Sequence, residues 1–395
     1  MSNKRLAAKT AAAGEVRLGV IGLGNMGAAH ARMVLEGKVP RMRLTAVCDV
    51  DASRLSFNGG IKGFTDSREL IRSGEVDAVL IAMPHYAHTP IGIDALGQGL
   101  HVLVEKPISV HKSDCEKLIA AHKPGTVFAA MFNQRTDPFY QKIRDLIQHG
   151  ELGEIRRVNW IITNWFRTHA YYASGGWRAT WAGEGGGVLL NQCPHNLDLL
   201  QWLFGMPARV RAFCRLGQYH DIEVEDDVTA YMEFKNGATG VFITTTGEAP
   251  GTNRLEIAGE KGKLVYQDER LEFTRNEVEM SEFSRTTDQA FATPPKWDAT
   301  IPVSGHGEQH LGILKNFTAA ILDGAALLAP AAEGIRSVEL ANAMLYSTFT
   351  DKTIEMPLDG KAYERQLKKL IASSMFKKKT SPKKGRAEDF AQSFR

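Results

Sequence analysis

The sequence predicts an α/β first domain built on a parallel sheet, followed by an α+β second domain built on a large open, mainly antiparallel sheet. Up to about residue 137, apolar strand segments alternate with helix-forming segments, which is typical of a parallel sheet covered on both faces. From residue 155 onward, longer half-polar strands follow one another, as in an antiparallel sheet with one polar face. The length of 395 residues is also too great for one small core.

The composition limits the class of protein. A hydrophobic content of 43% and a charged content of 24% are ordinary for a soluble globular chain. The four cysteines lie far apart without a CxxC pair, so we expect neither a metal site nor a disulfide framework. The N-terminal residues lack the apolar core of a signal peptide, and no apolar run is long enough to cross a membrane. We therefore expect a cytoplasmic protein without a membrane partner.

Changes in composition divide the chain into four parts. We expect a disordered N-terminus over residues 1–14, a first domain over 15–137, a second domain over 138–360 and a disordered tail over 361–395. The tail is rich in lysine and arginine, which is typical either of a contact for nucleic acid or membrane, or of a solvated segment. Since the body shows no basic stripe with interleaved aromatic residues, we expect no nucleic-acid partner.

The first predicted unit is a strand, a glycine-rich turn and a helix between residues 16 and 35. Branched apolar residues indicate a buried strand at 16–21, and a helix-forming segment follows the letters GLGNMG. In this pattern Gly22 permits the turn, Gly24 lets a pyrophosphate approach the main chain, and Gly27 lets the helix pack closely on the strand. The start of the helix points N–H groups at the phosphates. We therefore expect a dinucleotide site of the Rossmann type rather than a purely structural turn.

An acidic residue, Asp49, follows the next predicted strand at 43–48. A carboxylate at this position accepts hydrogen bonds from the adenosine ribose and repels a 2′-phosphate. It therefore favours NAD over NADP, although the nearby Arg54 weakens this preference.

The rest of the first domain continues the alternation of strands and helices. Ligands bind at the carboxyl ends of such strands, so we expect ligand contacts in the loop at 83–88, which includes Pro84. His85 and His88 either contact the ligand or bond to the loop main chain. The segments expected here are a helix at 65–73, strands at 76–82 and 101–104, a helix at 113–122 and a strand at 126–131.

Glu105, Lys106 and Pro107 close the strand that ends at residue 104. Proline rigidifies this turn, and a lysine at the carboxyl end of a strand lies where the chemistry of such a fold occurs. A solvated surface lysine is the alternative.

The second domain is predicted as a helix at 138–149 followed by a succession of strands. The dipeptide Asn236-Gly237 indicates a hairpin turn. We expect residues 281–305 to form a long irregular loop, and helices at 311–322 and 333–346 to pack back on the first domain. The expected strands are 155–163, 210–216, 228–234, 238–246, 254–258, 263–266 and 271–274.

Aromatic residues gather between positions 160 and 181, interrupted by small and polar residues that indicate a loop. An aromatic-lined loop with hydrogen-bonding tips suits a ligand with apolar ring faces and many hydroxyls, such as a sugar or cyclitol, whereas buried core is the alternative. Arg178 either clamps a carboxylate or phosphate or pairs with Glu184. The substrate contacts expected from this loop are Trp165, Tyr172, Trp177, Arg178 and Trp181.

A triple glycine at 185–187 precedes an apolar segment at 188–203 that contains Asn191, His195 and Asp198. Offsets of four and three place these polar residues on one face of a helix. Alternatively, Pro194 marks the first turn of the helix and leaves Asn191 on the preceding loop. The position of His195 after the triple glycine favours a functional over a structural histidine.

Three motifs in this order resemble the Gfo/Idh/MocA family of oxidoreductases. They are GLGNMG at 22–27, EKP at 105–107 and GGGVLLNQCPHNLDLLQWLFG at 185–205, and the similarity runs from about residue 16 to 350. The resemblance implies an N-terminal Rossmann domain, a C-terminal domain with an open antiparallel sheet, and homodimers or homotetramers assembled through that sheet. The cofactor residues expected are Gly22, Gly24, Asn25, Met26, Gly27, Asp49, Pro84, His85, His88, Glu105 and Lys106.

The resemblance also implies roles in hydride transfer at a ring hydroxyl. Lys106 would bridge cofactor and substrate, and His195 would be the general base. Asn191 stands where many family members carry aspartate, and its amide can orient a substrate but cannot ionise. We expect catalysis to use Lys106, His195 and Asn191, with Asn191 and His195 also contacting substrate.

We therefore expect an NAD-dependent oxidoreductase that acts on a ring hydroxyl of a sugar, cyclitol or glycoside. One alternative is an NAD-dependent glycosidase that works by transient oxidation, elimination and re-reduction. The other is a catalytically silent sugar sensor that binds NAD.

Overall fold

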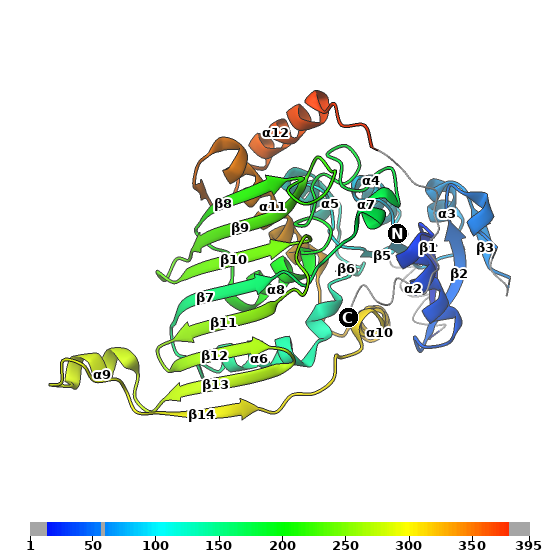
Figure 1. Ribbon diagram of the computed structural model, residues 1–395. Helices are drawn as coiled ribbons and strands as arrows, with labels where there is room; N and C mark the ends of the chain where they lie inside the picture. The colour runs from blue at the N-terminus through cyan, green and yellow to red at the C-terminus, as the bar shows by residue number, and fades with distance from the viewer. Residues whose placement is uncertain (1–13, 57–59, 379–395) are drawn as a thin grey trace.

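The computed structural model describes residues 14–56 and 60–378 and contains two sheets (Figure 1). Sheet A has six parallel strands in the order β3-β2-β1-β4-β5-β6, which confirms the predicted parallel sheet. The strand order reverses between β1 and β4, and sheets of this kind bind their ligands beyond the carboxyl ends of the strands at such a point. The strands are β1 (Val16–Ile21), β2 (Met42–Cys48), β3 (Lys62–Phe64), β4 (Ala78–Ile81), β5 (His101–Val104) and β6 (Phe128–Ala130).

Helices connect the strands of sheet A, and one of them was not predicted. Residues 83–88, expected as a loop, include the first turn of α4, which begins directly after Pro84. A proline suits the start of a helix, but the glycines and the internal Pro90 hide this helix from a propensity argument. The helices of this part are α2 (Asn25–Leu35), α3 (Ser67–Arg72), α4 (His85–Gly97) and α5 (Lys112–Ala120).

Sheet B has nine strands in the order β14-β13-β12-β11-β7-β10-β9-β8-β15. All neighbouring strands are antiparallel except β7 and β10, which confirms the mainly antiparallel sheet. The predicted hairpin turn joins β9 to β10, with Gly237 at a φ of 86°. The strands are β7 (Ile155–Ile162), β8 (Arg209–Leu216), β9 (Glu225–Glu233), β10 (Thr239–Thr245), β11 (Asn253–Gly259), β12 (Gly262–Gln267), β13 (Arg270–Asn276), β14 (Lys296–Ile301) and β15 (Ile354–Glu355).

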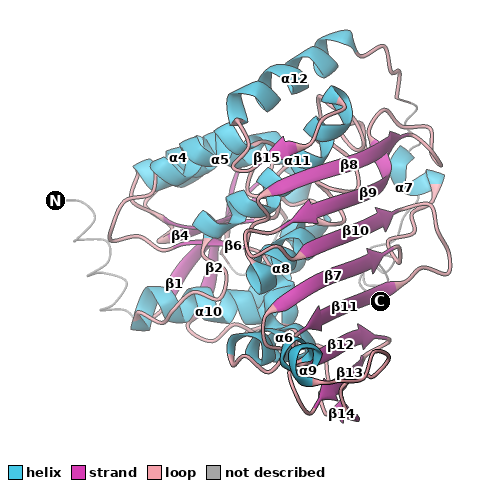
Figure 2. Cartoon of the chain, turned by 90° about the vertical axis from the view of Figure 1, so that its left-hand side faces the viewer, coloured by secondary structure: helices cyan, strands magenta, loops and turns pink. Residues whose placement is uncertain are grey.

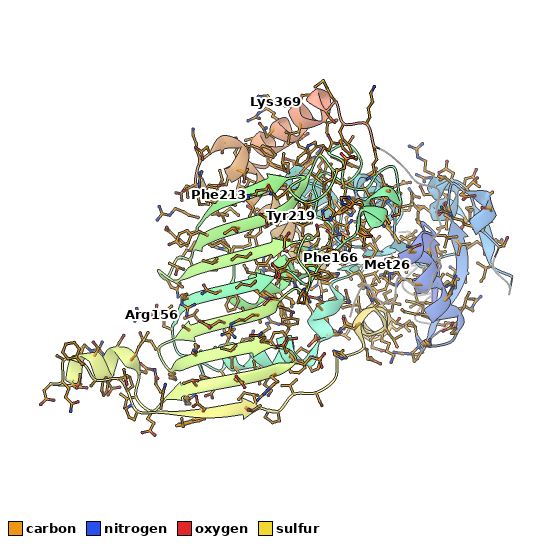
Figure 3. All side chains as sticks on the ribbon, in the orientation of Figure 1. Met26, Arg156, Phe166, Phe213, Tyr219 and Lys369 are labelled. Carbon is orange, nitrogen blue, oxygen red and sulfur yellow. The ribbon has the colours of Figure 1, made fainter. Side chains whose placement is uncertain are left out.

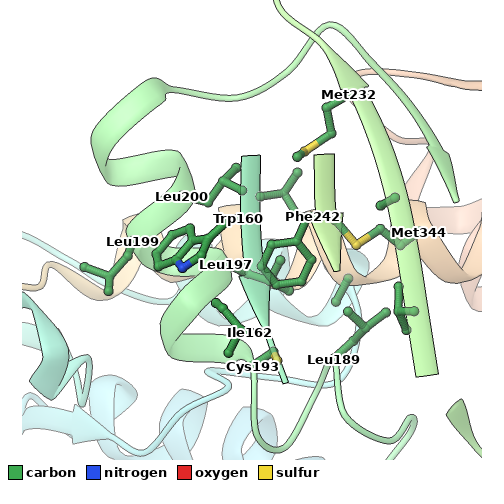
Figure 4. Packing of buried hydrophobic residues seen from close by; sticks show 14 of the residues in the cluster. Trp160, Ile162, Leu189, Cys193, Leu197, Leu199, Leu200, Met232, Phe242 and Met344 are labelled. Atoms are coloured by element: carbon green, nitrogen blue, oxygen red, sulfur yellow. The ribbon is translucent and has the colours of Figure 1, made fainter. Parts of the chain in front are cut away.

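Sheet B is covered by helices on one face and open on the other (Figure 2). The inner face packs on α6 (Pro138–Gln148), α8 (Pro194–Phe204) and α11 (Gly334–Thr350). Trp160 and Phe242, from neighbouring strands, lie beside Leu197 and Leu200 of α8 in this core (Figure 4). The other face carries exposed side chains such as Phe213 (Figure 3). Alternation of buried and exposed residues along each strand produces this division.

The expectation of an irregular loop at 281–305 is wrong. The helix α9 (Met280–Thr286) and the edge strand β14 form within this region. Most side chains of β14 are exposed, because main-chain hydrogen bonds to β13 rather than burial hold the strand. An exposed edge strand leaves little apolar pattern to detect.

The two C-terminal helices that were expected to pack on the first domain pack mainly on different sheets. The helix α10 (Gln309–Asp323) packs on sheet A as expected, with Phe317 in its core. By contrast, α11 lies mainly between α8 and β8, with Met344 in the core of sheet B. α11 also meets the first domain as expected, since Val338 lies in the core of sheet A and Asn342 bonds to the main chain of Lys112 and Val110. The expectation is thus confirmed, but it missed that the helix serves the second sheet as well.

The expected disordered tail is also corrected, since α12 (Gly360–Ser373) begins where the tail was expected. Asp359 caps the helix by accepting hydrogen bonds from two main-chain N–H groups, and Tyr363 and Leu367 are buried. The charge of this segment hid its helical apolar stripe. Residues 1–13 and 379–395, on which the other expectations of disorder fall, lie outside the described residues. Within the described ranges, no helix combines the length and apolar character needed to span a bilayer.

A buried ion pair joins the two parts of the molecule. The guanidinium of Arg135, on the short turn before α6, donates to both carboxylate oxygens of Asp198 on α8, at 2.7 and 2.6 Å. Arg135 also donates to Glu333 at 2.6 Å. Because Arg135 and Asp198 are each about 1% exposed, this contact fixes α8 against the end of the first domain.

Candidate active site

The glycine loop has the shape that a dinucleotide requires. A Cβ atom on Gly22, whose φ is 92°, would lie 2.5 Å from the carbonyl oxygen of Ala82, and one on Gly27 would lie 1.8 Å from that of Gly22. At Gly24, however, an added Cβ would meet nothing within 4 Å. Gly24 also caps α2 without a side-chain hydrogen bond, so the first N–H groups of the helix face this open space. Asn25 is exposed there, and Met26 lies beside it at the start of α2 (Figure 3). These residues fit a pyrophosphate.

Asp49 lies at the end of β2 and is buried. Its carboxylate accepts hydrogen bonds from the main-chain N–H groups of Leu23, at 2.8 Å, and Asp51, at 3.0 Å. Arg54 approaches the same carboxylate at 3.4 Å. Asp49 therefore anchors the glycine loop at the edge where the ribose of a dinucleotide would lie.

Lys106 and His195, expected from separate domains, lie near each other. The Nζ atom of Lys106 donates a hydrogen bond to the main-chain oxygen of Asn191 at 2.8 Å. His195 lies in the first turn of α8 and is 3% exposed, and neither of its ring nitrogens has a hydrogen-bond partner within the described structure. Burial, together with the charge of Lys106, lowers the pKa of His195 well below its usual value. The result is a buried neutral imidazole with two unused nitrogens.

Asn191 lies on the turn before α8, because Pro194 begins the helix. This selects the second of the two arrangements that the sequence allowed. The side-chain amide of Asn191 donates to Glu184, and Glu184 accepts a second hydrogen bond from the main-chain N–H of Ala179 at 2.6 Å. Burial raises the pKa of Glu184. The sequence considered Glu184 only as a partner of Arg178, and no spacing rule linked it to Asn191.

Glu105 belongs to a buried group behind Lys106 that the sequence did not reveal. It accepts a hydrogen bond from Nε2 of His30 on α2 at 2.7 Å. Burial alone would raise the pKa of Glu105, but the hydrogen bond with His30 and the charges of His30, His310 and Lys106 together outweigh it and hold the pKa at about 2. The ring of His310 on α10 lies 5.4 Å from that of His30. Glu105 is therefore a buried anion enclosed by histidines from two other segments.

The two histidines at the start of α4 contact the main chain. Nδ1 of His88 lies 2.8 Å from the carbonyl oxygen of Pro107, and Nε2 lies 2.7 Å from that of Met83. Nδ1 of His85 lies 3.1 Å from the carbonyl oxygen of Glu184, and its ring meets the ring of Trp177 at 5.8 Å. His88 thus bonds to the turn that contains Lys106, and His85 contacts the aromatic loop at Trp177.

The aromatic loop contains both core residues and exposed contacts. Tyr172 is buried, and its hydroxyl forms a hydrogen bond with that of Thr246 at 2.8 Å. Trp181 is buried against Phe349. These two residues therefore belong to the core, as the alternative to a ligand contact predicts. Trp165 is half-buried and donates to Asn196 at 3.1 Å.

Arg178 and Trp177 face the partly open side of the same loop. The guanidinium of Arg178 lies 4.7 Å from the ring centre of Tyr171 and donates to its hydroxyl at 2.8 Å. It also lies 4.8 Å from the ring of Trp177. Tyr171, which was not among the predicted site residues, thus lies at the centre of the polar contacts of this loop.

Two family models match the chain. One, described as an oxidoreductase family with an NAD-binding Rossmann fold, covers residues 16–131, and the other, the GFO/IDH/MocA C-terminal domain, covers residues 140–265. Together they match more than half of the chain.

Individual relatives agree with these matches. Myo-inositol 2-dehydrogenase from Thermotoga maritima is 28% identical over 268 residues, covering 65% of this chain and 76% of that protein. Levoglucosan dehydrogenase from Pseudarthrobacter phenanthrenivorans is 24% identical over 398 residues, covering 87% and 98%. The WlbA dehydrogenase from Bordetella pertussis, crystallised with NADH and UDP-GlcNAcA, shares the fold with a TM-score of 0.72 and 23% identity, covering 87% and 100%. The chain therefore belongs to the Gfo/Idh/MocA family of oxidoreductases, and its first domain is an NAD-binding Rossmann domain.

Proposed function

We propose that this protein is an NAD-dependent dehydrogenase that transfers a hydride between nicotinamide and a ring hydroxyl of a sugar, cyclitol or glycoside. The observation that supports this most directly is the meeting of Lys106 and His195 from two parts of the chain, with both nitrogens of His195 unused. The names of the relatives that act on inositol and levoglucosan agree with a ring hydroxyl as the reacting group.

Lys106 and His195 have complementary roles in this proposal. NAD, when bound, accepts the hydride from the ring carbon. His195 accepts the hydroxyl proton, because an alcohol is a poor hydride donor until its proton is being removed. The lowered pKa of His195 keeps the imidazole neutral and ready to accept that proton at neutral pH. Lys106 donates hydrogen bonds to the reacting oxygen and stabilises the negative charge that develops there.

Asn191 orients the substrate in this scheme. Its amide nitrogen donates to Glu184, which turns the amide oxygen away from that carboxylate and leaves it as an acceptor for a ring hydroxyl. Because an amide does not ionise near neutral pH, proton transfer depends on His195.

We propose NAD rather than NADP as the preferred cofactor. The buried carboxylate of Asp49 accepts hydrogen bonds and would repel a 2′-phosphate. Arg54 offsets part of this charge from one side.

We also propose a homodimer or homotetramer assembled through the open face of sheet B. This face carries large exposed side chains, including Phe213, Leu216 and Tyr231. The four cysteines are all buried free thiols, which supports a cytoplasmic location.

The proposed function is tested with purified protein, NAD, and a panel of sugars, cyclitols and aryl glycosides. We expect at least one ring substrate to produce NADH. NADH is measured by its nicotinamide absorbance. Release of aglycone without net NADH would replace this proposal with a glycosidase, and ligand binding without either product would replace it with a sensor.

Two substitutions test the assigned roles. His195→Asn and Lys106→Met should each lower kcat by about 10²- to 10⁴-fold while NAD affinity changes little. The matched controls His149→Asn and Lys263→Met, at exposed positions, should keep full activity. Full turnover by both active-site variants would contradict the roles given to these residues.

A further inference from the structure

A buried carboxylate connects the helix that follows the glycine loop to the turn that contains Lys106. One oxygen of Glu105, Oε1, lies 2.7 Å from Nε2 of His30, which is on α2 and fully buried. The other oxygen, Oε2, accepts a hydrogen bond from the main-chain N–H of Lys106 at 3.1 Å. The start of α2 is the part of the molecule that fits a pyrophosphate. Glu105 therefore joins the cofactor side of the site to Lys106.

The ammonium group of Lys106 is partly buried and has no carboxylate in direct contact. Its Nζ atom donates to the main-chain oxygen of Asn191 at 2.8 Å, and it forms no ion pair with any carboxylate of the described residues. Burial lowers the pKa of Lys106, whereas the negative charges of Glu105 and Glu184 act against this change. Lys106 therefore depends on nearby negative charge to stay protonated.

Of these two carboxylates, Glu105 holds its negative charge more firmly. The hydrogen bond with His30 and the surrounding positive charges hold the pKa of Glu105 at about 2. Burial instead raises the pKa of Glu184. The guanidinium groups of Arg178 and Arg167 lower the pKa of Lys106 further, so the charge of Glu105 acts against burial and against both of them.

The other titratable groups that interact with Lys106 or Glu105 supply no negative charge at neutral pH. Burial lowers the pKa of the histidines on α4, α8 and α10 and raises that of the thiol before α8 to about 12. Together with the histidine on α2, these groups are His30, His85, His88, Cys193, His195 and His310. Among the described residues around Lys106, negative charge therefore comes from Glu105 and Glu184.

We propose that Glu105 is a positioning residue for Lys106, and that His30 holds Glu105 in place. The carboxylate fixes the turn through the main-chain N–H of Lys106, and its charge keeps the Lys106 ammonium protonated, so that the ammonium can donate to the reacting oxygen. An ionised carboxylate only accepts hydrogen bonds, so Nε2 of His30 is the donor. This inference rests on the proposed function, because it concerns the lysine to which that function gives a catalytic role.

The first test measures the pKa of Lys106 without any substrate. Only the unprotonated amine reacts with acetic anhydride, so the extent of labelling of Lys106 against pH, read by mass spectrometry of the full-length protein after digestion, gives its pKa. Glu105→Gln keeps the size of the side chain and an accepting oxygen but removes the charge. We expect the pKa of Lys106 to fall by about one pH unit or more in this variant. An unchanged pKa of Lys106 in Glu105→Gln would overturn the proposal.

Substitutions at His30 test whether it acts through Glu105. His30→Leu removes the donor and should lower the pKa of Lys106 in the same direction, by about half a pH unit or more. His30→Gln provides an amide N–H in place of the imidazole N–H and should restore the pKa to within about 0.3 of the wild type. Equal pKa values of Lys106 in His30→Leu and the wild type would contradict the role given to His30.

His101→Gln is the control for loss of a buried histidine. His101 begins β5, at the opposite end of the strand from Glu105, and its ring accepts the main-chain N–H of Val127 at 2.8 Å. This variant should leave the pKa of Lys106 unchanged even where its melting temperature falls. A shift in His101→Gln as large as that in Glu105→Gln would show that general destabilisation causes the effect, and the proposal would fail.

Turnover gives a second readout once a substrate is known. The value of kcat/KM should fall at high pH as Lys106 loses its proton, and in Glu105→Gln this fall should begin about one pH unit lower. A lowered pKa of Lys106 without NADH formation from any ring substrate would overturn the dehydrogenase function and support the role of Glu105. An unchanged pKa of Lys106 with normal turnover would overturn the role of Glu105 alone.

Discussion

The glycine loop proposed to hold the cofactor and the region proposed to hold the substrate are built in different ways. We call them the cofactor loop and the substrate wall. The cofactor loop, residues 22–27, is shaped by the main chain: at Gly22 and Gly27 an added Cβ would collide with a carbonyl oxygen, and at Gly24 it would meet open space. The proposed substrate wall is assembled from side chains of distant segments, such as Lys106, Asn191 and His195. A site shaped by the main chain depends on a few local residues, whereas an assembled wall depends on how whole elements pack. The two regions should therefore respond differently to substitution.

The largest effect is expected where the assembled wall is fixed to the first domain. Arg135→Met leaves Asp198 as a buried carboxylate without its main partner, and we expect the free energy of unfolding to fall by about 3–5 kcal/mol. Urea unfolding followed by circular dichroism measures this change.

An exposed ion pair provides the control for this substitution. Arg270 and Glu272 are more than half exposed, so Arg270→Met should cost less than about 1 kcal/mol. Equal losses for the two variants would show that the buried pair has no special role in holding α8.

The next largest effect is expected from a substitution that distorts only the cofactor loop. In Gly27→Ala, the new Cβ would lie 1.8 Å from the carbonyl oxygen of Gly22, so the main chain must shift. We expect NAD affinity to fall by about a hundredfold or more, since the loop no longer presents its N–H groups correctly. Titration with NAD, followed by calorimetry, gives the affinity.

Gly24→Ala is the matched variant for this loop. Its Cβ meets no protein atom within 4 Å, so the melting temperature without NAD should stay that of the wild type while NAD binds about tenfold more weakly. Unchanged NAD affinity in Gly24→Ala would mean that the open space beside this residue does not hold the pyrophosphate.

The smallest effect is a change with pH in the free energy of unfolding, which we expect from Glu225 beside the turn before Asn191. Glu225 accepts hydrogen bonds from the main-chain N–H groups of Gly187, at 2.8 Å, and Leu189, at 3.1 Å, and its second oxygen has no partner within the described structure. Burial raises the pKa of Glu225 to about 7. The folded state therefore binds this proton more tightly than the unfolded chain does. The resulting stabilisation is present below the unfolded pKa and is lost as pH rises through about 7.

Glu225→Gln should remove this pH dependence. Between pH 5 and pH 8, the wild type should lose about 2 kcal/mol more of unfolding free energy than the variant does, because glutamine stays neutral throughout. Urea unfolding at four pH values between these limits measures the difference. Parallel curves for the two proteins would show that Glu225 does not titrate in this range.

Both sheets were predicted in outline, and most of their strands were placed by apolar pattern alone. The errors share a cause. The helix α4 contains glycine and proline and β14 is an exposed edge strand, so neither shows a strong apolar period. The helix α12 does have an apolar stripe, but the many charged residues around it hid the stripe. Their stability comes from contacts with neighbouring elements, which a local pattern does not record.

The sequence by itself determined the strand, glycine turn and helix of the cofactor loop, and it singled out Lys106 and His195. These signals are local, because turn geometry and helix starts depend on a few adjacent residues. Only the tertiary structure decided that His30 encloses Glu105, that Glu184 holds Asn191, and that Lys378 reaches Arg178. The residues in these pairs lie 75, 7 and 200 positions apart, and their contacts arise from the packing of the elements that carry them.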